Sequence, residues 1–195
     1  DKKLEIMAQG VGDKNIITML LIFLAAGSFV GVVGRSSAES VAYCMLSLIP
    51  ARFSVSVLFV VACFVSVAMG TSVGTITLLT PIAAAVSTAS GFDLAFCVAS
   101  VMGGAMFGDN LSFISDTTIV ATRTQGCNMN DKFKVNIRIA LPIAILTGLL
   151  YVLIGSGVGS GYETGPIEWI KVLPYLVVLV TAICGVNVMM VLIAS

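Results

Sequence analysis

The run from Phe53 to Phe92 constrains the fold most, because it contains no charged residue. As one helix it would be roughly 60 Å long at 1.5 Å per residue, which far exceeds the ~30 Å hydrocarbon core of a bilayer. The chain must therefore turn, and the sequence MGTSVGT at 69–75 marks the place. Two arrangements stay open. One is two crossings with a tight turn, for which the run is barely long enough. The other is a re-entrant hairpin with arms at Phe53–Met69 and from Ile76 to about Thr88, joined by a non-helical tip.

The composition indicates an integral membrane protein. Hydrophobic residues make up 58% of the chain and charged residues 10%, whereas soluble domains are about half apolar and about a quarter charged. The formal net charge is zero, so we expect no nucleic-acid partner. There is no histidine, the commonest ligand of transition metals, and the five cysteines are scattered without a CxxC pair. We predict an all-α fold in contact with membrane lipid, without a cofactor. No nucleophile–base pair or metal-hydrolase spacing points to an enzyme.

Other uncharged runs predict the remaining helices. Ser40–Ala51 is apolar but too short to cross a bilayer, and Pro50 ends it, so we predict a short interfacial or connecting helix. Residues 123–138 are predicted to form a basic loop. The remaining predicted crossings are Ile16–Val33, a broken span from Leu94 to about Thr122, Ile139–Ile154 and Val172–Ser195.

The distribution of positive charge favours the hairpin over a single crossing of 53–92. If both ends of 53–92 lie on one face of the membrane, seven of the ten basic residues share the other face: Lys2, Lys3, Lys14, Arg123, Lys132, Lys134 and Arg138. Arg35, Arg52 and Lys171 then lie opposite, whereas a single crossing would divide the ten six to four. Because basic residues concentrate on the cytoplasmic side, we predict a hairpin at about 53–88, with the N-terminus and the basic loop in the cytoplasm.

Two acids stand in the predicted broken span, within GGAMFGDNLSFISDTTIVATRTQGCN at 103–128. A carboxylate at membrane depth is costly and by default marks a functional site. Carboxylate, amide and hydroxyl oxygens suit a hard cation such as Na⁺. We predict Asp109 and Asp116 as Na⁺ ligands. The whole predicted cation- and proton-binding cluster is Asp109, Asn110, Ser112, Ser115, Asp116, Thr117 and Thr118. The structural alternative is that the two acids cap helices.

The polar tip of the hairpin is the second candidate region. Glycine permits the turn, and hydroxyl groups supply oxygens at membrane depth. The tip residues are Gly70, Thr71, Ser72, Gly74 and Thr75. The alternative for the three hydroxyls is hydrogen bonding to carbonyls of their own helix.

A hairpin whose tip meets a broken, acidic span is the arrangement of secondary transporters. Burial and a second carboxylate both raise the pKa of an acid, and such a group can hold either a proton or Na⁺. This competition is the minimal mechanism of a Na⁺/H⁺ exchanger. We predict one transmembrane transporter domain over 1–195, a polytopic helical bundle that forms one half of an inverted-repeat transporter. A fragment of a longer chain is expected, since there is no initiator Met and the sequence stops inside an apolar run.

Two segments resemble the signatures of a known family. GTSVGTITLLTPIA at 70–83 and GAMFGDNLSFISDTTIVATRTQGC at 104–127 are similar to signature segments of the NhaC Na⁺/H⁺ antiporter family, within the ion transporter superfamily. The resemblance extends from about Ile16 to the C-terminus. It implies a multi-pass exchanger of the bacterial cytoplasmic membrane that transports Na⁺ and H⁺, with site residues in the cluster and tip named above. Many members carry Pro where this chain has Phe113, which affects where the helix unwinds.

Two rival functions stay open. Similar proteins are associated with malate–lactate exchange and with amino-acid uptake. The alternative is therefore a Na⁺- or H⁺-coupled carrier of organic or amino acids, in which the acidic cluster binds the coupling ion and the GTSVGT tip binds the anion. A third hypothesis is an accessory subunit that merely packs. The protein partners to be tested are a second copy, giving a homodimer, and a second repeat of the same chain.

Overall fold

The computed structural model describes residues 2–33, 35–113, 115–155, 165–184 and 190. For some helical residues, among them Arg35, Asp116 and Arg123, it describes the backbone and not the side chain. All regular structure in these ranges is helical, as predicted. The elements are α1 (Lys2–Val11), α2 (Lys14–Val33), α3 (Arg35–Leu48), the 3₁₀ turn η1 (Ala51–Phe53), α4 (Ser54–Met69), α5 (Ser72–Ser90), α6 (Leu94–Leu111), α7 (Asp116–Thr124), α8 (Met129–Gly155) and α9 (Trp169–Ile183).

Several helices have the length and apolar surface of membrane spans. In the described part of the chain, four pass this test: α4 with the preceding η1, α5, α6 and α8. The bent pair α2–α3, at 81°, makes a fifth candidate. α8 exposes a continuous set of large apolar side chains, which suits contact with lipid or with another apolar helix. They are Ile139, Leu141, Ile143, Ile145, Leu146, Leu149, Leu150, Leu153 and Ile154. The prediction of a polytopic helical membrane protein is confirmed.

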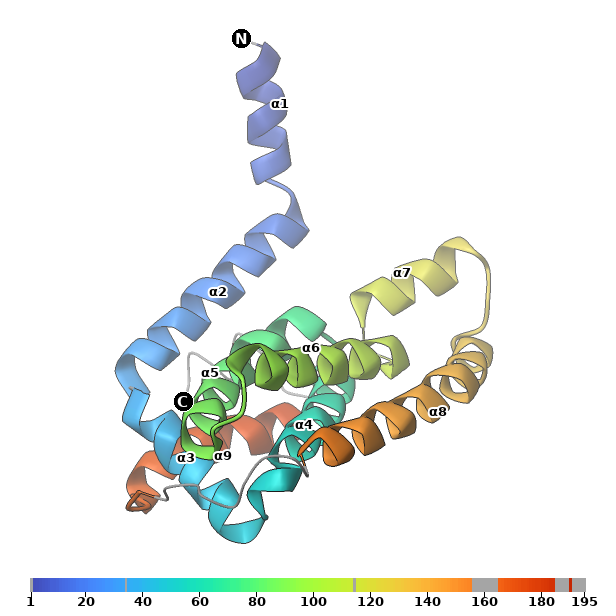
Figure 1. The fold of residues 1–195 in the computed structure, drawn as a ribbon. Coiled ribbons are helices and arrows are strands. Elements are labelled where there is room, and N and C mark those ends of the chain that lie inside the picture. Colours follow the sequence, from blue (N-terminus) through green and yellow to red (C-terminus); the bar gives the residue numbers. More distant parts are fainter. Residues whose placement is uncertain (1, 34, 114, 156–164, 185–189, 191–195) are drawn as a thin grey trace.

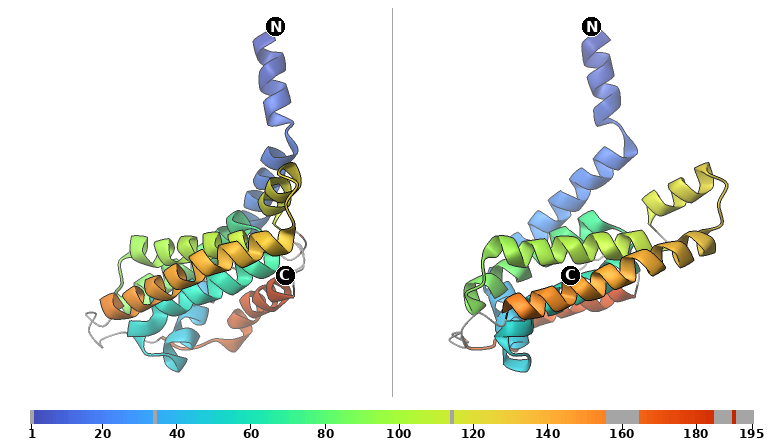
Figure 2. Two further views of the ribbon diagram at one scale, coloured as in Figure 1. Left: turned by 90° about the vertical axis from the view of Figure 1, so that its right-hand side faces the viewer. Right: turned by 45° about the vertical axis from the view of Figure 1, so that its right-hand side comes forward.

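The core lies between α3, α4, α5, α6 and α9. Val55, Leu79, Val86 and Val101 are among its most buried side chains. Figure 1 shows α4, α5 and α6 in the middle of the bundle and α8 along one side. α1 and the beginning of α2 extend away from the bundle in all three views (Figures 1 and 2). The views of Figures 1 and 2 also place the end of α6 and the beginning of α8 together at one end of the bundle.

Two glycines allow α6 to lie directly on α4. A Cβ atom at Gly104 would sit 2.8 Å from the Cβ of Ala62, and one at Gly108 would sit 2.6 Å from the Cβ of Ser66. The contacts advance by four residues on both helices, so α4 and α6 run parallel and their C-terminal ends lie together. This spacing is the small-xxx-small pattern of close helix pairs in membranes. This packing role was not predicted from the sequence.

The hairpin turn is shorter than predicted. α4 ends at Met69, Gly70 takes a left-handed conformation with φ 67°, and the Thr71 side chain caps α5 by accepting from the Gly74 N–H at 3.4 Å. Residues 72–75 are helical, so the predicted non-helical tip is wrong beyond Thr71. Because the turn takes only two residues, α4 and α5 are each long enough to cross a bilayer. The length of 53–92 therefore does not argue against two full crossings.

Two other segments also differ from the sequence prediction. α3 begins at Arg35 and buries Ala38, Ala42 and Leu46, with α5 and α9 as its main neighbours. The predicted short interfacial or connecting helix at 40–51 thus begins five residues earlier, at Arg35, and ends at Leu48, and one of its faces packs on the bundle. The predicted basic loop is mostly helical, since α7 runs to Thr124 and α8 begins at Met129. Of the last predicted span, residues 185–189 and 191–195 lie outside the described residues.

Candidate cation site

The chain breaks its helical course between α6 and α7, where the sequence predicted a break. α6 ends at Leu111, and Ser112 is extended with φ −69° and ψ 138°. The side chain of Phe113 is exposed and stacks on Phe133 of α8, with ring centroids 4.7 Å apart. α6 has the length of a span without α7. The break therefore comes at the end of a crossing-length helix, next to the beginning of α8.

Asp109 lies in the last turn of α6 and is half-buried. Its Oδ1 atom is enclosed and has no hydrogen-bond partner among the described residues. An unsatisfied buried polar atom costs about 1–3 kcal/mol, and more when it is charged. A proton or a small cation at Oδ1 would remove this cost.

Asp116 is the first residue of α7, and its side chain lies outside what the structure describes. On one continuous helix, Asp109, Ser112 and Asp116 would fall on one face, at positions i, i+3 and i+7. The structure instead divides them between α6, the break and α7. The relative position of residues 109 and 116 is therefore set by the break and not by helical periodicity.

The other predicted cluster residues fall into two groups. Around the end of α6, Ser112 Oγ donates to the Val67 carbonyl at 2.8 Å, and the side chain of Asn110 donates to the Met106 carbonyl at 3.0 Å. The side-chain NH₂ group of Asn110 is thus engaged within α6. In the second group, the hydroxyls of Ser115 and Thr117 pair with each other at 2.8 Å. Thr118 belongs with the first group through the contact described next.

A residue that the sequence analysis assigned to a basic loop enters this site. Lys132 Nζ donates to the Asn110 carbonyl and, at 2.8 Å, to Thr118 Oγ1. Asn136 Nδ2 donates to the same Asn110 carbonyl at 3.3 Å. Lys132 and Asn136 are four residues apart on α8, so both point to one face of this helix. That spacing was the available signal, and it was missed because 123–138 was interpreted as a loop.

The hairpin tip adjoins the site through its backbone. Ser112 bonds to the carbonyl of Val67, which lies three residues before Gly70. Thr75 is fully buried, and its hydroxyl donates to the Thr71 carbonyl at 2.9 Å, while the Thr71 hydroxyl serves as a cap. Ser72 opens α5, and Gly74 is buried in its first turn. For Thr75 the structure shows the alternative, a hydroxyl that donates to a carbonyl at the start of its own helix, whereas the Thr71 hydroxyl accepts from an N–H as an N-cap.

The ends of the helices add electrostatic character to the site. The C-terminal ends of α4 and α6 lie together, and each carries partial negative charge on its last carbonyls. Asp109 adds a carboxylate to the end of α6. Such an arrangement favours a cation. Within the described residues no group of three His, Cys, Asp or Glu side chains could hold a metal ion, so nothing there indicates a transition-metal centre.

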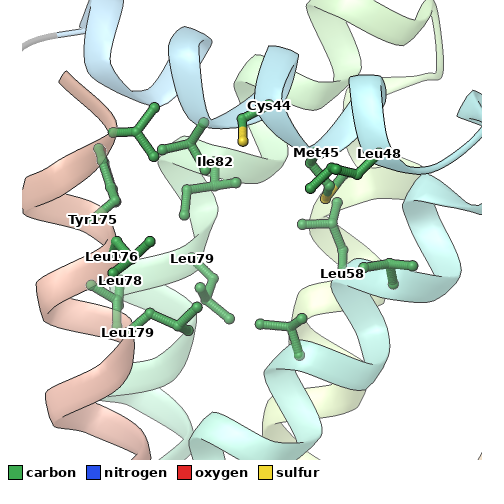
Figure 3. Close-up of a pocket in the computed structure, with 14 residues that line it drawn as sticks. Cys44, Met45, Leu48, Leu58, Leu78, Leu79, Ile82, Tyr175, Leu176 and Leu179 are labelled. Atoms are coloured by element: carbon green, nitrogen blue, oxygen red, sulfur yellow. The ribbon is translucent and has the colours of Figure 1, made fainter. Parts of the chain in front are cut away.

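A cavity of about 260 Å³ lies elsewhere, between α3, α4, α5 and α9. Figure 3 shows its apolar lining, which includes Cys44, Leu58, Leu79 and Leu176. None of the predicted site residues lines it. The cavity presents no polar surface, so it offers nothing to bind the carboxylate of an organic acid.

Residues 5–156 match a family model described as the Na⁺/H⁺ antiporter family. The Na⁺/H⁺ antiporter NhaC of Alkalihalophilus pseudofirmus is 33% identical over 111 residues, which cover 56% of this chain and 24% of that protein. The malate-2H⁺/Na⁺-lactate antiporter of Bacillus subtilis is 24% identical over 163 residues, covering 82% of this chain and 35% of that protein. An uncharacterised Na⁺/H⁺ antiporter of Haemophilus influenzae is 30% identical over 149 residues, which cover 74% of this chain and 32% of that protein. The chain thus spans between a quarter and about a third of these relatives, and no solved structure matches it.

Proposed function

Because the chain belongs to the Na⁺/H⁺ antiporter family, we propose that it is part of a secondary transporter that exchanges Na⁺ for H⁺ by competition at Asp109 and Asp116. The family is one of transporters and not of enzymes. Family membership and the apolar helices together make the chain a multi-pass protein of the bacterial inner membrane. The observation that carries the proposal is the enclosed and unpartnered Oδ1 atom of Asp109 at the break.

The mechanism follows from the free-energy cost of leaving Asp109 Oδ1 buried without a proton, a cation or a hydrogen-bond donor. A proton on the Asp109 carboxylate neutralises it, and a Na⁺ ion on the same carboxylate does so as well. Because one carboxylate does not hold both well, arrival of either cation expels the other. If the site opens to one side of the membrane at a time, this competition couples the two gradients.

The proposed arrangement includes parts beyond this chain. Inverted-repeat transporters build their ion sites where two repeats meet, and this chain spans 24–35% of the relatives it matches. We therefore include in the proposal a second repeat within the complete protein, and a homodimer as its assembled form. Asp116 belongs to the proposal through the sequence motif.

The test is Na⁺-driven proton movement in proteoliposomes that contain the complete protein. We expect Asp109→Asn to lower the exchange rate by about tenfold or more, equivalent to about 1.4 kcal/mol or more, because the amide cannot exchange a proton for a cation. Asp93→Asn is the matched control. Asp93 is exposed and caps α6 by accepting from the Phe96 N–H at 3.2 Å, and asparagine caps equally well.

Three outcomes of this assay test the proposed exchange at Asp109. Loss of exchange in Asp109→Asn with normal exchange in Asp93→Asn supports the proposal. Equal exchange rates in the two variants would exclude competition at Asp109. Wild-type protein that moves no protons in response to Na⁺ would exclude the exchange itself, provided that the protein is folded.

One relative supports a second candidate function. The B. subtilis malate-2H⁺/Na⁺-lactate antiporter covers more of this chain than the A. pseudofirmus NhaC protein does. The rival is therefore a carrier of organic acids in which the Asp109 region binds only the coupling ion. The same proteoliposomes distinguish the two, because proton movement that requires added malate or lactate indicates the carrier.

A further inference from the structure

Lys132 differs from the basic residues around it. It lies in the first turn of α8, yet its ammonium group reaches the end of α6 and hydrogen-bonds to the Asn110 carbonyl and to Thr118 Oγ1. Lys134, two residues later, behaves as a surface charge. Its side chain is 68% exposed and pairs loosely with Asp131 at 4.0 Å. The two lysines share a helix but have different surroundings.

The partners of Lys132 are the kinds of atom that bind Na⁺. Asn110 supplies one of the carbonyls that the helix end leaves without an intrahelical partner. Thr118 supplies a buried hydroxyl oxygen from α7. Hard cations are bound in proteins by carbonyl, hydroxyl and carboxylate oxygens. The ammonium group therefore occupies a position with an oxygen lining that suits a sodium ion.

The ammonium group hydrogen-bonds to the carbonyl of Asn110, which is adjacent to Asp109 in the chain, and its charge interacts with the Asp109 carboxylate. Asp109 and Lys132 form no direct ion pair within 4.0 Å among the described residues, and Oδ1 has no donor. The ammonium group thus bonds to the residue that follows Asp109 without satisfying the Asp109 carboxylate. A Na⁺ ion that approaches Oδ1 must meet the field of the ammonium group.

Other contacts hold α8 in place independently of this charge. Asn136 donates to the Asn110 carbonyl at 3.3 Å, and Phe133 stacks on Phe113. Replacement of Lys132 by a neutral side chain of similar length leaves both contacts. We therefore expect neutral variants to fold.

We propose that Lys132 is a built-in rival of the transported cation: its ammonium group occupies the oxygen-lined position beside Asp109 and must be displaced, or repelled, when Na⁺ binds. The proposal rests on the proposed exchange function and adds a residue that sets the sodium affinity of the same site. Lys132 thus acts on the concentration range in which the transporter responds to Na⁺.

The test measures two quantities in proteoliposomes with the complete protein: the Na⁺ concentration at half-maximal proton movement, and the maximal rate. We expect Lys132→Gln and Lys132→Met to lower that concentration by about fivefold, as removal of a nearby like charge should. Lys132→Arg keeps the charge and should stay within about twofold of wild type. Lys134→Gln, the matched control, should not change it. Na⁺-dependent thermal stabilisation of the purified variants gives a second measure of binding that does not depend on transport.

The outcomes distinguish failure of the proposed exchange function from failure of the proposed role of Lys132. If wild type shows no Na⁺-driven proton movement and no Na⁺ binding, the exchange function fails and takes this inference with it. If wild type exchanges but the neutral variants need as much Na⁺ as Lys134→Gln, or more, the rival role of Lys132 is overturned. If both neutral variants unfold while Lys132→Arg folds, Lys132 is a structural cap of α6, and the proposal is likewise overturned.

Discussion

At the scale of single residues, Gly108 explains how an acid comes to lie beside α4. The next residue is Asp109, and the contact of Gly108 with Ser66 and the backbone of Val67 brings this turn of α6 against the end of α4. A larger residue would push the turn outward. The position of Asp109 thus depends on a missing side chain in its neighbour.

We predict that Gly108→Ala destabilises the protein by about 2 kcal/mol, the usual cost of overpacking. The added Cβ would lie 2.6 Å from the Cβ of Ser66 and 2.8 Å from the Val67 nitrogen, so the helices must separate. The measurement is the midpoint of thermal unfolding in detergent. Gly103→Ala is the control, because its Cβ would find no atom nearer than 3.7 Å. Equal midpoints for the two variants would show that α4 and α6 are not in close contact.

At the scale of elements, the two-residue turn between α4 and α5 depends on a cap. The Thr71 hydroxyl accepts from the Gly74 N–H, one of the donors at the beginning of α5 that have no intrahelical partner. Thr71→Ala should therefore destabilise by about 1 kcal/mol, while Thr71→Ser, which keeps the oxygen, should cost much less. Chemical denaturation of both variants in the same detergent measures this. If serine were as costly as alanine, the methyl group rather than the cap would be responsible.

Local sequence patterns predicted where helices begin and end better than they predicted the contacts between helices. The break after Leu111 and the turn at Gly70 were predictable, because glycine and a run of polar side chains disfavour helix within apolar sequence. The extent of the turn was not, since a threonine that caps and one that lines a cavity look alike in sequence. Lys132 escaped prediction for another reason. Its contact with Asn110 joins residues 22 positions apart, and it exists only because α8 returns along α6.

At the scale of the whole molecule, polar and apolar features separate along the bundle. The break, the tip and the beginning of α8 gather oxygens and charges at one end, where Ser112 bonds to the Val67 carbonyl and Lys132 bonds to the Asn110 carbonyl. The lining of the cavity between α3, α4, α5 and α9 is apolar. The proposed cation site therefore lies at the end of the bundle that carries Lys132 and Arg138, and the orientation of the chain decides which compartment that end faces.

Cysteine labelling tests this orientation and the nature of the hairpin. The distribution of basic residues predicts a cytoplasmic location for 123–138, so exposed Cys127, kept as the one cysteine, should react with an impermeant maleimide in inside-out vesicles and not in intact cells. Ser47→Cys, on the exposed side of α3 near Arg52, should show the reverse. Ser72→Cys at the tip then separates the two hairpin arrangements. Labelling as fast as that of Cys127 indicates two full crossings, which the lengths of α4 and α5 allow, whereas protection indicates a re-entrant tip. Labelling of Cys127 from outside would invert the topology and place the Asp109 end of the bundle against the external solution, where external Na⁺ would reach Lys132 first.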